Sequence, residues 1–186
     1  MEPEADSAAA PVWATENVHI VDYDPAWAER AAVFTGEIRA LLEGWLTGPV
    51  AHVGSTAIPF LSAKPIIDLQ ATAPNPAEVI ATMHEAMAAA SWFFVPRELD
   101  QRPWRWFVVR ADHTGRHRLA HLHLMQPGEP RWDRQLLFRD RLRADPGLRQ
   151  EYARVKATAA RQNSHDREAY TNAKATFVRR VLHQSY

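Results

Sequence analysis

The spacing of hydrophobic and polar positions divides this chain into a mixed helical and extended part and an all-helical end. Apolar side chains recur at helical spacing between residues 25 and 45, directly after an Asp24-Pro25 start that favours a helix N-terminus. A second helix is predicted from Asn75-Pro76 to about residue 90, with Glu78 placed to complete its cap. Five short apolar runs are typical of strands: residues 50–53, 65–71, 91–95, 104–110 and 118–125.

Beyond residue 130 the pattern predicts helices alone. One covers residues 132–144, a second starts at Asp145-Pro146, and a third follows the polar stretch 163–166. This order of elements predicts an α+β fold, in which a mixed β-sheet is backed by helices and the C-terminal third is helical.

Length and composition fit a single globular domain. The chain has 186 residues, of which 46% are hydrophobic, enough to build one core. The first 16 residues are acidic and rich in alanine, so we expect residues 1–16 to form a disordered tail and residues 17–186 to form the domain.

Charge and cysteine content exclude several classes of protein. The formal net charge is zero, which disfavours a large nucleic-acid or membrane-binding surface. There is no cysteine, so disulfides, thiolate metal sites and thiol catalysis are excluded. No run of about 18 apolar residues predicts a membrane span, and the N-terminus does not resemble a signal peptide. We expect a cytoplasmic protein without membrane or nucleic-acid partners, of undetermined oligomeric state.

The richest chemistry lies in the loop between the first two predicted strands. Gly54 permits a positive φ or a close backbone approach, and Ser55 and Thr56 supply hydroxyls suited to phosphate oxygens. Lys64 adds a point charge, and Asp68 adds a carboxylate that can hold a divalent cation. The loop therefore predicts a site for a phosphorylated or other anionic small molecule, with the Gly54–Ser55 turn at the mouth of a polar pocket.

The same stretch, HVGSTAIPFLSAKPIIDL at 52–69, resembles the signature of the GrpB family, also called UPF0157. The resemblance continues through HLHL at 121–124, FRDRLRADP at 138–146, EYARVK at 151–156 and YTNAKATFVRRVL at 170–182, and it covers residues 18–183. It implies a nucleotidyltransferase-superfamily fold, which in some members is fused to dephospho-coenzyme A kinase.

The implied superfamily holds Mg²⁺ ions with two or three carboxylates, and here the set is incomplete. Strand alternation puts Asp68 on the same face as Gln70, which stands where the second carboxylate is expected. An amide offers a carbonyl oxygen but no charge. We therefore expect one Mg²⁺ at most, on Asp68 with Gln70, and no efficient two-metal nucleotidyl transfer. Asp68, Lys64 and His123 are the predicted catalytic residues.

Two histidines stand two residues apart on a predicted strand and so face the same side. His121 and His123 have the spacing to bind one Zn²⁺ ion, or a phosphate when protonated. His52 completes a set of three only if the strands bring it close. The alternative is that these histidines are half-buried and hydrogen-bonded to their neighbours.

Several cations near apolar helix faces are consistent with an anionic ligand. Arg139 and Arg143 share a helix face, Arg118 opens the histidine strand, and Lys174 and Lys156 lie beside apolar stripes. The alternative is a set of solvated helix faces with salt bridges to acidic neighbours.

Three functions remain open from the sequence. The first is an atypical nucleotidyltransferase-fold enzyme that binds a nucleotide or another phosphorylated molecule. The second is a ligand-binding module without catalysis, and the third is a hydrolase or lyase with a histidine-held metal ion.

Overall fold

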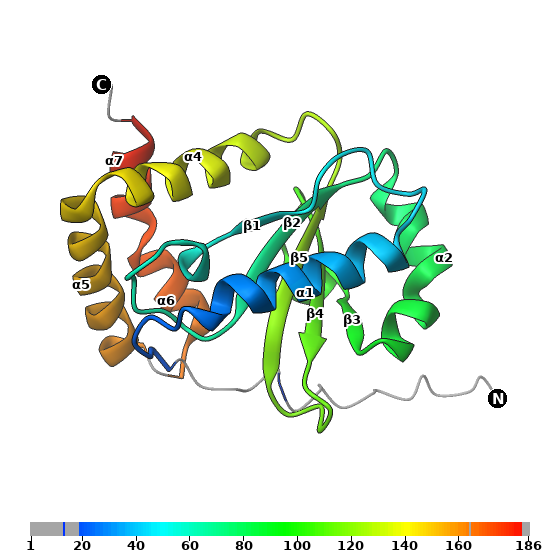
Figure 1. The fold of residues 1–186 in the computed structure, drawn as a ribbon, viewed down its shortest axis with the longest axis horizontal. Helices are drawn as coiled ribbons and strands as arrows, with labels where there is room; N and C mark the ends of the chain where they lie inside the picture. Colours follow the sequence, from blue (N-terminus) through cyan, green and yellow to red (C-terminus); the bar gives the residue numbers. More distant parts are fainter. Residues whose placement is uncertain (1–12, 14–18, 164, 184–186) are drawn as a thin grey trace.

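The computed structural model describes Trp13, residues 19–163 and residues 165–183, and it centres on one five-stranded sheet (Figure 1). The strands lie in the order β1-β2-β5-β4-β3. Strands β2 and β5 are parallel and every other neighbouring pair is antiparallel, so the predicted mixed sheet is confirmed. The strands are β1 Ala51–Val53, β2 Ile67–Thr72, β3 Trp92–Val95, β4 Trp106–Ala111 and β5 Arg118–Met125.

Helices α1 (Ala26–Leu41) and α2 (Pro76–Ala89) supply the apolar cover of one sheet face. Each starts as its sequence predicts: an Asp24 oxygen accepts from the Ala26 N–H at 2.9 Å, and Asn75 accepts from Glu78 N–H at 3.3 Å. The face they bury includes Ile67, Leu69, Ala71, Leu122 and Leu124.

The C-terminal helices gather at the end of the molecule away from α2 (Figure 1). They are α4 (Pro130–Ala144), α5 (Pro146–Gln162), α6 (Arg167–Ala173) and α7 (Ala175–His183). A second core joins them to the loop after β1, because Ile58 and Leu61 of that loop pack among their buried residues. This core fixes the short 3₁₀ helix η2 (Ser55–Ala57), which begins the loop, against the helical end.

Three features differ from the sequence prediction. The first helix ends at Leu41 instead of residue 45, because residues 42–45 form a turn with Gly44 at a φ of 78°. The last predicted helix is broken at Lys174 into α6 and α7. A short helix α3 (Arg97–Asp100) was not predicted, since a single turn leaves no periodic pattern.

The other face of the sheet carries polar side chains. Because Ile67 and Leu69 enter the core, alternation turns Asp68 and Gln70 to the opposite side, as predicted. Trp13 packs on the same side against Phe107 of β4. The rest of the predicted tail 1–16 lies outside the described residues. Among the described residues, no helix is both long and apolar enough to cross a bilayer.

Candidate functional site

Asp68 lies at the centre of the polar face, held by the two histidines of β5. The parallel register sets Asp68 beside His121 and Gln70 beside His123. His121 Nδ1 is 2.9 Å from Asp68 Oδ1, and His123 Nε2 is 3.8 Å from the same oxygen. Burial acts to raise the pKa of Asp68, but the hydrogen bonds from both histidines hold it well below its usual value. The carboxylate is therefore anionic at neutral pH.

Both histidines are neutral at that pH. Burial lowers the pKa of His121 to about 4, and burial together with the nearby Arg105 guanidinium lowers the pKa of His123. Neutral His121 therefore donates its Nδ1 proton to Asp68. The Nε2 atom of His121 is buried without a hydrogen-bond partner.

Gly54 brings the loop backbone directly against Asp68. It has a φ of 70° and a ψ of −169°, a conformation that only glycine adopts readily. A Cβ atom at this position would lie 2.3 Å from Asp68 Oδ2 and 2.9 Å from Asp68 Cβ. The second carboxylate oxygen therefore faces the Gly54–Ser55 turn.

The two hydroxyls of the loop have different surroundings. Thr56 is buried, and its hydroxyl lies 3.0 Å from His52 Nε2 and 3.4 Å from the Ile66 carbonyl. Burial lowers the pKa of His52 to about 4, so a neutral ring with its proton on Nε2 satisfies both contacts. Ser55 instead hydrogen-bonds the Tyr152 hydroxyl of α5. Of the pair, Ser55 therefore faces the helical end.

All three lysines of the chain converge on the two tyrosines of that end. Only three of the 22 Lys and Arg residues are lysine. Lys64 and Lys174 lie over the Tyr170 ring, with Nζ atoms 4.7 Å and 4.0 Å from its centroid. Lys156 Nζ lies 5.0 Å from the Tyr152 centroid and donates to the Ser62 carbonyl.

These ammonium groups repel one another inside the protein. Burial first, and then the charges of Lys174 and Lys64, lower the pKa of Lys156 to about 7. Burial and the charge of Lys64 also lower the pKa of Lys174 to about 7, although Asp68 opposes the shift. The structure thus brings Lys174 of the predicted set near Asp68, with Lys64 over the same Tyr170 ring as Lys174.

The predicted arginines have structural partners. Arg139 donates to the His52 carbonyl at 2.9 Å, and Arg143 donates to the Ala57 carbonyl at 2.8 Å, so both tie α4 to the loop around Gly54. Arg118 donates to the Trp13 carbonyl at 3.0 Å and covers its ring. Through these contacts the three arginines stabilise backbone segments around the site.

Gln70 is wholly buried at the position of the missing carboxylate. Its amide nitrogen donates to the Trp132 carbonyl of α4 at 3.2 Å, and its Oε1 has no hydrogen-bond partner. Asp68 is the one carboxylate within the five strands. Nowhere in the described part of the chain do three or more His, Asp or Glu side chains group as metal ligands. Asp68 is therefore the one charged acceptor that the strands present on this face.

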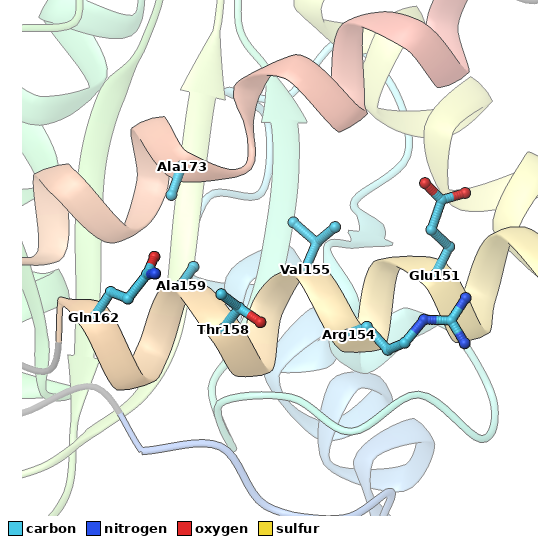
Figure 2. Close-up of a pocket in the computed structure, with 7 residues that line it drawn as sticks. All are labelled: Glu151, Arg154, Val155, Thr158, Ala159, Gln162 and Ala173. Carbon is cyan, nitrogen blue, oxygen red and sulfur yellow. The ribbon is translucent and has the colours of Figure 1, made fainter.

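A cavity of about 360 Å³ lies elsewhere, along α5 (Figure 2). Its lining comes from α5 and Ala173, and includes Glu151, Arg154 and Gln162. The sequence placed a pocket at the Gly54–Ser55 turn, lined by Asp68, His123 and Lys64, and none of these residues lines this cavity.

Several residues of the site escaped the sequence analysis. Arg105 forms a buried ion pair with Asp100 behind His123, a pairing that no local sequence pattern predicts. Tyr152 and Tyr170 lie on the apolar faces of their helices, where the pattern does not distinguish them from core residues. The sequence does contain one signal for these tyrosines, since the chain has many arginines but few lysines. In the structure each lysine lies over the ring of Tyr152 or Tyr170.

The family model described as "GrpB protein" matches residues 17–184. This chain belongs to the GrpB family. A UPF0157 protein from Pseudomonas aeruginosa is 37% identical over 90% of this chain and 67% of its own length. A dephospho-CoA kinase from Mycobacterium tuberculosis is 29% identical over 94% of this chain, which spans only 47% of that protein.

Solved structures agree on the fold. GrpB from Enterococcus faecalis has a TM-score of 0.74 at 24% identity, over 88% of this chain and 94% of that one. The Cid1 poly(U) polymerase with MgGTP bound has a TM-score of 0.56 at 12% identity, over 83% of this chain and 50% of that one. The GrpB domain therefore has a nucleotidyltransferase-like fold.

The contact between Gly54 and Asp68 generates a prediction. Gly54→Ala strains the backbone by about 1–3 kcal/mol and displaces the Asp68 side chain. We expect urea denaturation to show at least that loss in the free energy of unfolding. Gly36→Ala is the matched control: no atom lies within 4 Å of a Cβ at this helical position, so it should gain about 0.5–1 kcal/mol. Equal effects of the two substitutions would contradict the close approach.

The lysine cluster predicts an unusual dependence of stability on pH. Folding lowers two lysine pKa values from 10.5 to about 7, so the unfolded chain binds more protons between these limits. The free energy of unfolding should therefore rise from pH 7 towards pH 10. Above pH 10 it should fall, because burial raises the pKa of Tyr152 to about 12.

Chemical denaturation at stepped pH measures this curve. The variant Lys156→Met/Lys174→Met is the comparison, and its stability should be nearly constant from pH 7 to pH 10. A rise of the same size in both proteins would show that other groups cause it.

Proposed function

We propose that this GrpB domain binds a nucleotide or another phosphorylated small molecule, together with one Mg²⁺ ion, between Asp68 and the three lysines. The observation that carries the proposal is the convergence of every lysine of the chain on Tyr152 and Tyr170, beside Asp68 and Ser55. The phosphate groups of such a ligand would balance the positive charge of the three lysines.

Electrostatics support an anionic ligand. Lys156 and Lys174 are held where burial and repulsion from neighbouring lysines, Lys64 among them, disfavour their charged forms, at a cost to the unliganded protein. A polyphosphate relieves both effects, because it replaces lost hydration with direct ion pairs in a region of low dielectric. Attraction should therefore increase with the number of phosphate charges.

The choice of lysine also fits phosphate. The chain uses arginine at structural anchors, where Arg139 and Arg143 donate to backbone carbonyls. Lysine is a compact charge with three donors on a flexible stem, and it can follow a phosphate group as the ligand moves. Ser55, which hydrogen-bonds Tyr152 at the edge of the cluster, adds a hydroxyl.

Asp68 is the residue that would hold Mg²⁺, through the oxygen that faces the Gly54–Ser55 turn. When bound, the ion would neutralise phosphate charge and polarise a phosphoryl oxygen. Asp68 supplies one negative charge and Gln70 supplies none, so the donor set suits one ion better than two. His121 and His123 orient the carboxylate from behind.

The relatives agree with this class of ligand. Cid1 shares the fold and is described with MgGTP bound. The dephospho-CoA kinase match covers less than half of that protein, so its activity is not assigned to this chain. The donor set at Asp68 instead supports an atypical or repurposed nucleotidyltransferase-fold protein.

The lysine cluster gives the direct test. Thermal-shift measurements with inorganic phosphate, pyrophosphate, triphosphate and nucleoside triphosphates should show stabilisation that increases with phosphate number. Lys156→Met and Lys174→Met should each abolish most of the shift while making the unliganded protein more stable, because a buried charge is removed. Arg161→Met, which removes an exposed cation from the same helix as Lys156, is the control and should leave the shift unchanged. Ligand shifts that survive both lysine substitutions would overturn the proposed site.

The metal contribution is tested at Asp68. Asp68→Asn keeps the size of the side chain but removes its charge, so Mg²⁺ or Mn²⁺ should no longer strengthen ligand binding in calorimetric titrations. Binding without metal should persist, because the lysines are intact, and far-UV circular dichroism should be unchanged. An unchanged metal dependence would leave Asp68 with a structural role only. Wild-type protein that releases pyrophosphate with two bound ions would refute the single-ion assignment.

A further inference from the structure

A buried polar chain runs behind Asp68 and ends at a second carboxylate. Arg105, which precedes β4, pairs with Asp100 of α3 through two hydrogen bonds, Nε to Oδ2 at 3.0 Å and Nη2 to Oδ1 at 2.5 Å. The remaining guanidinium nitrogen, Nη1, lies 2.5 Å from His123 Nδ1. His123 Nε2 then faces Asp68. Four side chains on three elements and one loop thus connect two carboxylates.

The chemistry of the guanidinium fixes where the histidine proton lies. Arginine has only N–H donors, so His123 Nδ1 must accept and cannot carry a proton. The single proton of the neutral ring is therefore on Nε2, directed at Asp68. His121 has the opposite arrangement, since its Nδ1 donates to Asp68. The two rings present protons to the same carboxylate oxygen from different nitrogen atoms.

The surroundings leave His123 little freedom to depart from this arrangement. Its ring lies between Trp104 and Phe107, at centroid distances of 5.7 Å and 5.5 Å and nearly parallel to both. The Arg105 guanidinium covers the Phe107 ring at 3.8 Å. Arg105 and Asp100 are 8% and 7% exposed, so the low dielectric strengthens their ion pair and its hydrogen bonds.

We infer that Arg105 is a positioning residue, which fixes the tautomer of His123 so that its Nε2 proton is directed at Asp68 and the ring cannot ligate a metal ion. Asp100 holds the guanidinium in the plane that this requires. The inference rests on the proposed function only in so far as Asp68 is the metal-binding carboxylate. The tautomer itself is a property of the unliganded protein.

Two consequences distinguish this role from simple packing. With both ring nitrogens committed, His123 is not available to Zn²⁺ in the intact protein. With its Oδ1 hydrogen-bonded to His121 and faced by His123 Nε2, Asp68 keeps Oδ2 for a cation at the Gly54 turn. Loss of Arg105 should change both properties while the sheet remains intact.

The experiment is long-range ¹H–¹⁵N correlation NMR on protein labelled at histidine. In the wild type, His123 should show a protonated Nε2 and an unprotonated Nδ1, and His121 should show the reverse. The test variant is Asp100→Asn/Arg105→Met, which removes the two buried charges together so that neither is left uncompensated. Arg102→Met is the control, because Arg102 lies 3.7 Å from the same carboxylate but forms its shorter ion pair with Glu168, at 2.7 Å.

The expected result is a mixture of His123 tautomers in the double variant and the wild-type pattern in the control. A protonated Nδ1 in the wild type would overturn the inference, and so would an unchanged pattern in the double variant, which would show that Asp68 alone sets the tautomer. The mutant Arg105→Lys, which keeps the charge and a donor, should restore the wild-type tautomer in part.

Metal binding supplies a second readout. Mn²⁺ affinity should fall about 10–100-fold in the double variant, the usual effect of losing a partner of a metal ligand, and Zn²⁺ binding should appear. Equal Mn²⁺ affinity in wild type and double variant would overturn the positioning role. If neither protein binds Mn²⁺ while the tautomers behave as expected, the proposed metal site fails and the tautomer assignment stands.

Discussion

The close approach of the Gly54 backbone to the Asp68 side chain is the constraint on which the rest of the site depends. The loop can pass this near a carboxylate only because residue 54 has no Cβ and adopts a positive φ. Its path then places Ser55 beside Tyr152 and buries Ile58 and Leu61 in the second core. One backbone conformation therefore joins the polar face of the sheet to the C-terminal helices.

The sheet and the helices behave as two parts with different tasks. Strands β2 and β5 present Asp68 and the histidines on a rigid surface, whose reverse side is sealed by α1 and α2. The helical end contributes the lysines and the tyrosines that surround them. Arg139 and Arg143 tie these parts together through backbone carbonyls, and their role towards an anionic ligand stays a prediction.

Local patterns were sufficient to predict the five strands, most of the helices and the sheet faces within residues 65–71 and 118–125. Alternation along residues 65–71 placed Asp68 and Gln70 on one face, and the same rule placed the two histidines on one face of their strand, because a side-chain period of two is set by the backbone. The β2–β5 register then brings the two pairs together. The break at Lys174 and the pairing of Asp100 with Arg105 depend on contacts between distant segments, which no local period encodes. The orientation of the Thr56 hydroxyl could not be predicted from local sequence either, because it contacts His52 only once β1 and the loop have folded.

The distribution of amines has a consequence for the covalent chemistry of this protein. Acetylation, carbamylation and glycation all target lysine amines, and each reacts with the uncharged form. All of the chain's lysine side chains lie at one site, and two of them lose their protons near pH 7. Within the described residues, side-chain amine modification is therefore confined to the neighbourhood of Tyr152 and Tyr170, where a single adduct removes one of the charges that the cluster brings together.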